Sequence, residues 1–175
     1  SNDLINDVQS FETKINKYPD ITFFGGYLET RAVYNSSDYE RLTDTGFENR
    51  TTHLGIDFWV KDNIPVHSIE DGHIKIITND TTSNGYGGLI IIEHSIGKII
   101  YYSLYGHLSD QKKSVLKVGS FVKKGEKIGK IGSISENGGW SPHLHFQLML
   151  TLLDYQNDFP GVCIEYEKDI WSSIC

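Results

Sequence analysis

The spacing of hydrophobic residues changes once along the chain. Within residues 1–20 apolar side chains recur every three or four positions, which predicts one amphipathic helix with Asn2 or Asp3 as its N-cap and Pro19 as its stop. Its apolar face comprises Leu4, Ile5, Val8, Phe11 and Ile15. From Ile21 onward, short apolar or alternating runs are separated by Gly, Asn, Asp and Ser, which indicates consecutive antiparallel strands.

These strands are expected at 21–34, 53–60, 64–68, 72–78, 88–94, 98–107, 120–122, 127–132 and 143–152. Residues 35–50 are polar, and we expect them to form a loop with a short helical turn that rims a groove. The stretch from Asp154 onward has no regular pattern and is expected to be irregular. The chain is therefore predicted to be mainly β, with one helix at its start.

Three of the expected strands carry histidine on one face. Because side chains alternate along a strand, residues two positions apart share a face. That face holds His53, Gly55, Asp57 and Trp59 in HLGIDFWV, His143 and His145 in SPHLHF, and Tyr101, Ser103, Tyr105 and His107 in YYSLYGHL. If these faces line one groove, imidazoles and a carboxylate converge there in the nitrogen and oxygen set that catalytic zinc favours.

The two histidines of SPHLHF constrain this site further. Their positions on one strand lie roughly 6 to 7 Å apart, whereas a zinc–nitrogen bond is only about 2 Å long. A strand therefore does not easily aim both His143 and His145 at one ion. One of them is expected to bind the metal, and the other is expected to reach the metal-bound water as a general base.

Composition and charge narrow the class of protein. A chain of 175 residues fits one domain, or one domain with a short appendage, and no stretch is long and apolar enough to predict a transmembrane segment. The formal net charge of −7 disfavours nucleic acid as a partner. Cys163 and Cys175 are compatible with a disulfide or with two free thiols, so they leave the compartment open.

The motifs HLGID, YGHLS and SPHLHF, in this order, resemble the lysostaphin and LytM type of zinc endopeptidase, which cleaves peptide bonds in peptidoglycan. GYGGLIIIEH and LKVGSFVKKGEKIGKIG are similar to further passages of that family, so the resemblance runs from about His53 to Leu148. It implies antiparallel sheets of the LytM type, a duplicated hybrid motif of barrel-sandwich form. It also implies one zinc ion held by His53, Asp57 and His145, with His107 and His143 as the catalytic histidines.

The resemblance divides the chain into three parts. Residues 1–50 become a helix with a rim or linker segment, 51–153 the catalytic domain, and 154–175 an irregular extension. Some relatives carry a tyrosine, thought to donate to the oxyanion, six positions before the first ligand, where this chain has Phe47. The hydroxyl is then absent or comes from elsewhere, with Tyr101 and Tyr105 as candidates.

The implied function is hydrolysis of a peptide or peptidoglycan-like amide bond outside the cytoplasm. The alternative is a zinc-bound β module that binds glycan, peptide or a partner enzyme without catalysis, as part of a larger chain that could be cytoplasmic. A biotinyl or lipoyl carrier module lacks support, because VKKGEKIGKIG contains no recognition motif around a lysine. The remaining histidines, His67, His73 and His94, are expected at the surface or rim, and Trp59 and Trp140 as packing residues or groove walls.

Overall fold

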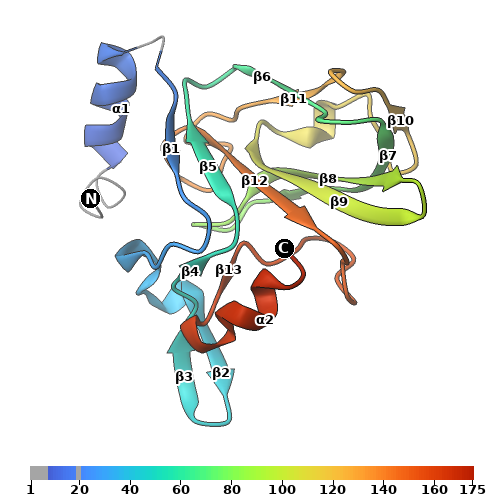
Figure 1. The fold of residues 1–175 in the computed structure, drawn as a ribbon. Helices are drawn as coiled ribbons and strands as arrows, with labels where there is room; N and C mark the ends of the chain where they lie inside the picture. The colour runs from blue at the N-terminus through green and yellow to red at the C-terminus, as the bar shows by residue number, and fades with distance from the viewer. Residues whose placement is uncertain (1–7, 19–20) are drawn as a thin grey trace.

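The computed structural model describes residues 8–18 and 21–175 and is built around one antiparallel sheet of seven strands (Figure 1). Along this sheet the order is β1 (Phe23–Gly25), β5 (Ile56–Trp59), β12 (His143–Met149), β9 (Ile99–Leu108), β8 (Gly87–Ile96), β7 (Gly72–Asp80) and β10 (Phe121–Val122). Three two-stranded sheets pair β6 (Pro65–His67) with β11 (Lys127–Lys130), β4 (Thr52–His53) with β13 (Val162–Cys163), and β2 (Glu40–Thr43) with β3 (Gly46–Asn49). The prediction of a mainly β chain with antiparallel sheets is confirmed.

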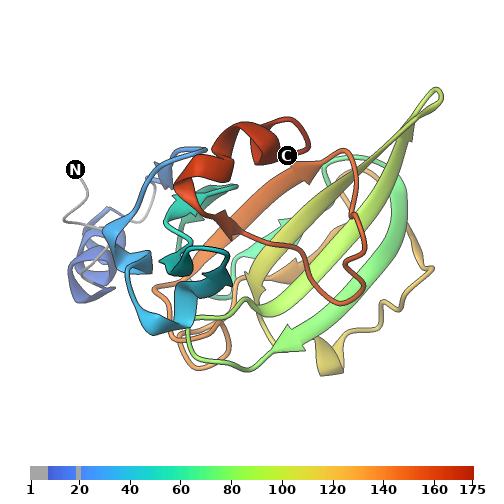
Figure 2. The same ribbon diagram turned by 90° about the horizontal axis from the view of Figure 1, so that it is seen from below.

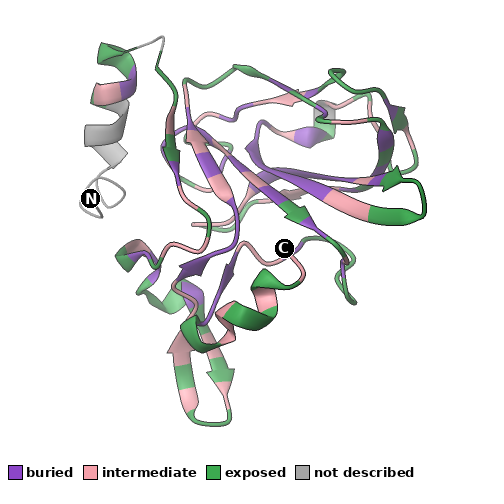
Figure 3. Ribbon diagram, viewed as in Figure 1, coloured by how far each residue is buried: buried purple, intermediate pink, exposed green. Residues whose placement is uncertain are grey.

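Hydrophobic cores lie on both faces of the main sheet. On β8, Ile90 and Ile92 belong to one core, and Leu89 and Ile91 belong to the other. A strand that is buried on both faces needs a continuous apolar run, which explains the sequence LIII. Each fully buried Leu or Ile contributes about 1.5–3 kcal/mol, so these central strands are the main source of stability. Figure 3 shows the buried residues along them.

Helix α1 (Val8–Lys17) lies beside the β1 edge of the sheet (Figure 1). Its Ile15 packs against Trp59 and Phe23. The expected start of this helix, with its N-cap, Leu4 and Ile5, lies outside the described residues, as does Pro19. No helix of residues 8–18 and 21–175 is long and apolar enough to cross a bilayer.

The prediction of a strand at 21–34 is confirmed only for its first part and is wrong after Gly25. β1 ends at Gly25, and the chain then turns through Leu28, whose φ is +58°. It touches β4 by a single bridge between Thr30 and Thr52, then forms the 3₁₀ turns η2 (Ala32–Tyr34) and η3 (Ser37–Tyr39). The consecutive Gly25 and Gly26 end the strand, because glycine opposes a long extended run.

The prediction of a loop at 35–50 is also wrong in part, because β2 and β3 form a hairpin that projects from the body of the molecule (Figure 1). Leu42 and Phe47 are cross-strand partners near its tip, and they are 68% and 71% exposed. A hairpin with solvent on both sides needs no alternation of apolar and polar residues, so the period-2 signal is missing.

The segment from Asp154 is not irregular. It contains β13, the 3₁₀ turn η5 (Glu165–Glu167) and the short helix α2 (Lys168–Ser172). The tail lies over one face of the main sheet, where Phe159 is fully buried in a core with Leu89 and Met149 (Figure 2). A two-residue strand and a five-residue helix are too short to produce a readable periodicity.

Candidate metal centre

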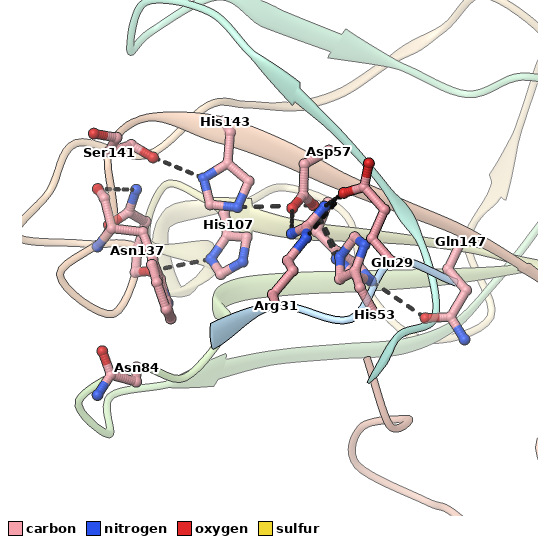
Figure 4. Close-up of polar contacts among 12 residues, drawn as sticks. Glu29, Arg31, His53, Asp57, Asn84, His107, Asn137, Ser141, His143 and Gln147 are labelled. Carbon is pink, nitrogen blue, oxygen red and sulfur yellow. Dashed lines mark hydrogen bonds and ion pairs between the residues drawn. The ribbon is translucent and has the colours of Figure 1, made fainter. Parts of the chain in front are cut away.

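The polar faces of two neighbouring strands and the ends of two others converge on one buried cluster. It consists of His53 from β4, Asp57 from β5, His143 and His145 from β12, and His107 from β9, and each is less than 10% exposed. Figure 4 labels His53, Asp57, His107 and His143 of this cluster. The register explains the meeting, because Asp57 is paired with His145 and Trp59 with His143. Directly paired residues of antiparallel strands point to the same face.

Three of these side chains have the spacing of metal ligands. His53 Nε2 lies 2.9 Å from His145 Nδ1 and 3.3 Å from Asp57 Oδ1, and His145 Nδ1 lies 3.1 Å from the same oxygen. Two ligands about 2.0–2.1 Å from a tetrahedral zinc ion lie roughly 3.3 Å apart. The three atoms therefore form a triangle of the size that one such ion requires.

The hydrogen bonds of the two imidazoles assign their tautomers. His145 Nε2 donates to Gln147 Oε1 at 3.2 Å, and His53 Nδ1 faces the carbonyl oxygen of Gly26 at 3.5 Å. Each N–H is thus directed at an acceptor outside the triangle, which leaves a lone pair on His53 Nε2 and on His145 Nδ1. Gln147 is buried and in turn donates to the carbonyl of Pro160, so its orientation is fixed.

These tautomers test whether a metal fits the site. Two nitrogens that both carry lone pairs at 2.9 Å repel one another unless a proton or a cation lies between them. A neutral His53 that carried its one proton between the two nitrogens would turn the lone pair of its Nδ1 toward the carbonyl oxygen of Gly26, so a cation is the better occupant. Two neutral imidazoles and one carboxylate fit a divalent cation such as zinc.

Gly55 makes room for this arrangement. A Cβ at this position would lie 2.6 Å from His145 Cε1 and 2.8 Å from the carbonyl oxygen of Phe146. Contacts this close do not occur, so any larger residue would push His145 out of place. The glycine of the HLGID motif therefore allows the strand that carries Asp57 to approach the strand that carries His145.

His107 and His143 have their basic nitrogens free. Nδ1 of His143 donates to the carbonyl of Ser141 at 2.7 Å, and Nδ1 of His107 donates to the carbonyl of Asn137 at 3.1 Å. Nε2 of each ring is therefore an acceptor, and His143 Nε2 lies 3.9 Å from Asp57 Oδ1. Burial lowers the pKa of His143 and holds the pKa of His107 well below its usual range, so both are neutral bases at pH 7.

His107 reaches this cluster by a backbone irregularity. Strict alternation along β9 places it on the face of Tyr105, and that prediction is wrong. A register shift interrupts the β8–β9 pairing beside Tyr105, and His107 has a φ of +60°. Its ring consequently lies 4.1 Å from the ring of His143, centroid to centroid. Tyr105 instead faces the core, where its hydroxyl accepts from the amide of Ile69.

Arg31 is a member of the site that sequence reasoning missed. Its Nη1 donates to Asp57 Oδ2 at 2.5 Å and to the Tyr34 hydroxyl at 3.2 Å, while its Nη2 donates to Glu29 at 3.2 Å. The side chain is 2% exposed, and no motif marks it. Burial alone would raise the pKa of Asp57, but the surrounding histidines hold it well below its usual range, so the carboxylate is ionised.

The cluster opens into a cavity of about 340 Å³. Its walls come from the segment between β1 and β2, Arg50, the loop before β8, Trp140, and the tail from Tyr155 to Val162. The expectation that residues 35–50 rim a groove is met by Asp38, Tyr39 and Arg50, but Phe47 does not line the cavity. Trp59 and Trp140 both do.

The other histidines and the cysteines lie outside the cluster. His67 and His73 are exposed, as expected. The expectation for His94 is wrong, because its ring is 1% exposed and bonded to the Ser103 hydroxyl at 2.6 Å. Cys163 and Cys175 are free thiols, the first buried and the second half-buried.

Comparison with known proteins gives a family and a fold. The profile of Peptidase family M23 matches residues 51–157. An uncharacterized metalloprotease of Buchnera aphidicola subsp. Baizongia pistaciae is 30% identical over 152 residues, which is 82% of this chain and 37% of that protein. The glycyl-glycine endopeptidase ALE-1 of Staphylococcus capitis is 39% identical over 58% of this chain and 25% of its own length. The chain thus spans well under half the length of these relatives.

Solved structures agree on the fold. The catalytic domain of lysostaphin from Staphylococcus simulans superposes with a TM-score of 0.50 at 24% identity, covering 95% of this chain and 98% of that domain. The catalytic domain of the prophage-encoded M23 protein EnpA from Enterococcus faecalis, solved as a point mutant, gives 0.52 at 20% identity, covering 81% and 90%. The expected LytM and lysostaphin type of fold is therefore confirmed.

Proposed function

This chain belongs to peptidase family M23, and from that premise we propose that it is a zinc-dependent metalloendopeptidase that hydrolyses a peptide or peptidoglycan-like amide bond. The observation that carries the proposal is the triangle of His53, Asp57 and His145, whose lone pairs converge beside two neutral histidine bases. A relative named as a glycyl-glycine endopeptidase supports a peptide bond as the target. If the target is peptidoglycan, the enzyme acts outside the cytoplasm, where that polymer lies.

The ligands of the metal would be His53 Nε2, Asp57 Oδ1 and His145 Nδ1. Zinc in such a site acts as a Lewis acid and lowers the pKa of a coordinated water to about 7. Gln147 keeps His145 in the ligating tautomer through the bond to Nε2. The clustered side chains are themselves buried, which strengthens the electrostatic interactions among them.

His143 and His107 would carry the proton. His143 Nε2 is the acceptor nearer to the ligand carboxylate, so it takes the proton of the attacking water. Because the rings lie 4.1 Å apart, a positive charge on one ring opposes protonation of the other. The pair therefore accepts one additional proton at a time. That proton then goes to the nitrogen of the leaving amine, and both histidines return to their neutral state.

The test is cleavage by purified, zinc-loaded protein of peptidoglycan fragments and of glycine-rich peptides, followed by mass spectrometry. We expect cleavage by the native chain and by a His73→Ala control, whose side chain is exposed outside the cluster, and none by His145→Ala. Equal cleavage by His145→Ala would contradict the metal mechanism. Stoichiometric zinc without cleavage of any substrate would favour the non-catalytic binding module.

A further inference from the structure

Hydrolysis of an amide places a negative charge on the former carbonyl oxygen, and a hydrogen-bond donor aimed at this oxyanion stabilises the transition state. The five clustered residues offer no such donor when neutral. His53 and His145 present lone pairs toward the metal position, and His107 and His143 present acceptors. Phe47, where some relatives carry a tyrosine, has no hydroxyl and is 71% exposed on the hairpin.

Tyr34 is the candidate for the missing donor. It lines the same cavity, and its ring is stacked on the ring of His53 at a centroid distance of 6.3 Å. Its hydroxyl accepts from Arg31 Nη1 at 3.2 Å, and the same nitrogen donates to Asp57 Oδ2 at 2.5 Å. One guanidinium nitrogen therefore bridges the hydroxyl to a ligand carboxylate. Because the oxygen is the acceptor in this bond, its own proton is available to donate.

Arg31 is held too firmly to act on substrate itself. Its Nη2 donates to Glu29 at 3.2 Å, and its guanidinium lies over the ring of Trp59 at 5.7 Å. Because Arg31 binds Oδ2 of Asp57, only Oδ1 faces His53 and His145, at 3.3 and 3.1 Å. A carboxylate bound through one oxygen leaves a coordination position for water or the substrate carbonyl, as a catalytic zinc site requires.

We propose that Tyr34 is the oxyanion donor of this site and that Arg31 is a positioning residue, which fixes Asp57 as a one-oxygen ligand and orients the Tyr34 hydroxyl through the same nitrogen. The proposal rests on the proposed function and adds a catalytic residue to it. Arg31 and Tyr34 lie outside the motifs that resemble the family, because both precede the first ligand, His53, by about twenty positions.

Trp140 is the competing donor. Its indole Nε1 is buried and has no partner among the described residues, and its ring lies edge-on to Tyr34 at 6.4 Å. The ring also packs near His107 and His143, at 6.3 and 6.5 Å. Tyr34 is favoured because a bridging nitrogen ties its hydroxyl to the ligand carboxylate, whereas no such contact orients the indole toward Asp57.

The test uses inorganic phosphate as a tetrahedral oxyanion probe, measured by calorimetry on the zinc-loaded chain. For Tyr34→Phe we expect phosphate affinity at least tenfold weaker, because a hydrogen bond to a charged group is lost, with zinc affinity unchanged. Trp140→Phe should bind phosphate as the native chain does. On a cleaved peptide, Tyr34→Phe should lower kcat by about 10²–10³-fold with little change in KM. Zinc-free protein is the control for phosphate bound elsewhere.

Arg31→Lys tests the positioning role, because lysine keeps the charge but cannot contact Asp57 and Tyr34 with one planar fork. We expect weaker binding of both zinc and phosphate, with the fold verified by circular dichroism. Unchanged phosphate binding by Tyr34→Phe, a loss in Trp140→Phe instead, or no binding by the native chain would overturn the inference. Phosphate binding that depends on Tyr34 in a chain that cleaves no peptide would refute the proposed function alone.

Discussion

Gln147 offers a direct test of how the metal centre is oriented. Its Oε1 is the acceptor for His145 Nε2 at 3.2 Å, and its side chain is 2% exposed. In Gln147→Leu this N–H becomes a buried donor without a partner, which costs about 1–3 kcal/mol. At about 1.4 kcal/mol per factor of ten, zinc affinity should fall by roughly 5- to 150-fold, a range that includes the 10–100-fold typical of residues that orient a ligand.

The assay is zinc transfer to a coloured chelator of known affinity at pH 7.5. Gln147→Glu is the matched variant, because a carboxylate also accepts from His145 Nε2 although it loses the amide donor to the carbonyl of Pro160, and we expect its affinity to exceed that of Gln147→Leu. Leu148→Gln is the control for substitution on this strand, since Leu148 points to the other face and is 45% exposed. A folded Gln147→Leu protein that binds zinc as tightly as the native chain would refute the reasoning.

Three further outcomes are expected. The metal-free chain should lose stability as the pH falls below about 6.5, because burial lowers the pKa of His53 from 6.5 to about 4 and the unfolded state then binds a proton that the folded state does not. Urea unfolding should show a loss approaching about 3 kcal/mol near pH 4, and a flat profile would contradict this account. Phe159→Ala should lower the free energy of unfolding by about 3–5 kcal/mol in the same assay, whereas little change would mean that the tail is dispensable. Phe47→Ser should leave peptide cleavage unchanged and should change the free energy of unfolding by no more than about 0.5 kcal/mol. A loss of activity would mean that the β2–β3 hairpin contributes to catalysis.

The sequence predicts the central strands of the main sheet better than those at its margin. β7, β8, β9 and β12 are long and contain alternating or continuous apolar residues, so they are visible in the sequence, although the more buried face of β12 is the one that carries His143 and His145. The β2–β3 hairpin and β13 lack this signal, because the first is exposed on both sides and the second has two residues. The division at residues 50 and 153 stays a prediction, although segments from both outer parts line the cavity.

The same contrast holds at the site. Asp57, His143 and His145 share a face by simple alternation, so their convergence follows from the strand pattern. His53 lies on the separate strand β4, because the strand expected at 53–60 is interrupted at Leu54 and Gly55. Arg31 and Tyr34 come from an irregular segment, and only the tertiary fold brings them to Asp57. Their arrangement depends on the turn after Gly25 and on the bridge between Thr30 and Thr52, and neither leaves a periodic trace.

The left-handed backbone of His107, with its φ of +60°, affects how the ring should be removed in a mutant. Alanine at this position would combine two losses, because it adopts the left-handed region less readily than histidine does and also lacks the base. Asparagine adopts the left-handed region readily, so His107→Asn deletes the imidazole while keeping the curve of the chain. Any deficit of that variant then reports on proton transfer rather than on a displaced strand end.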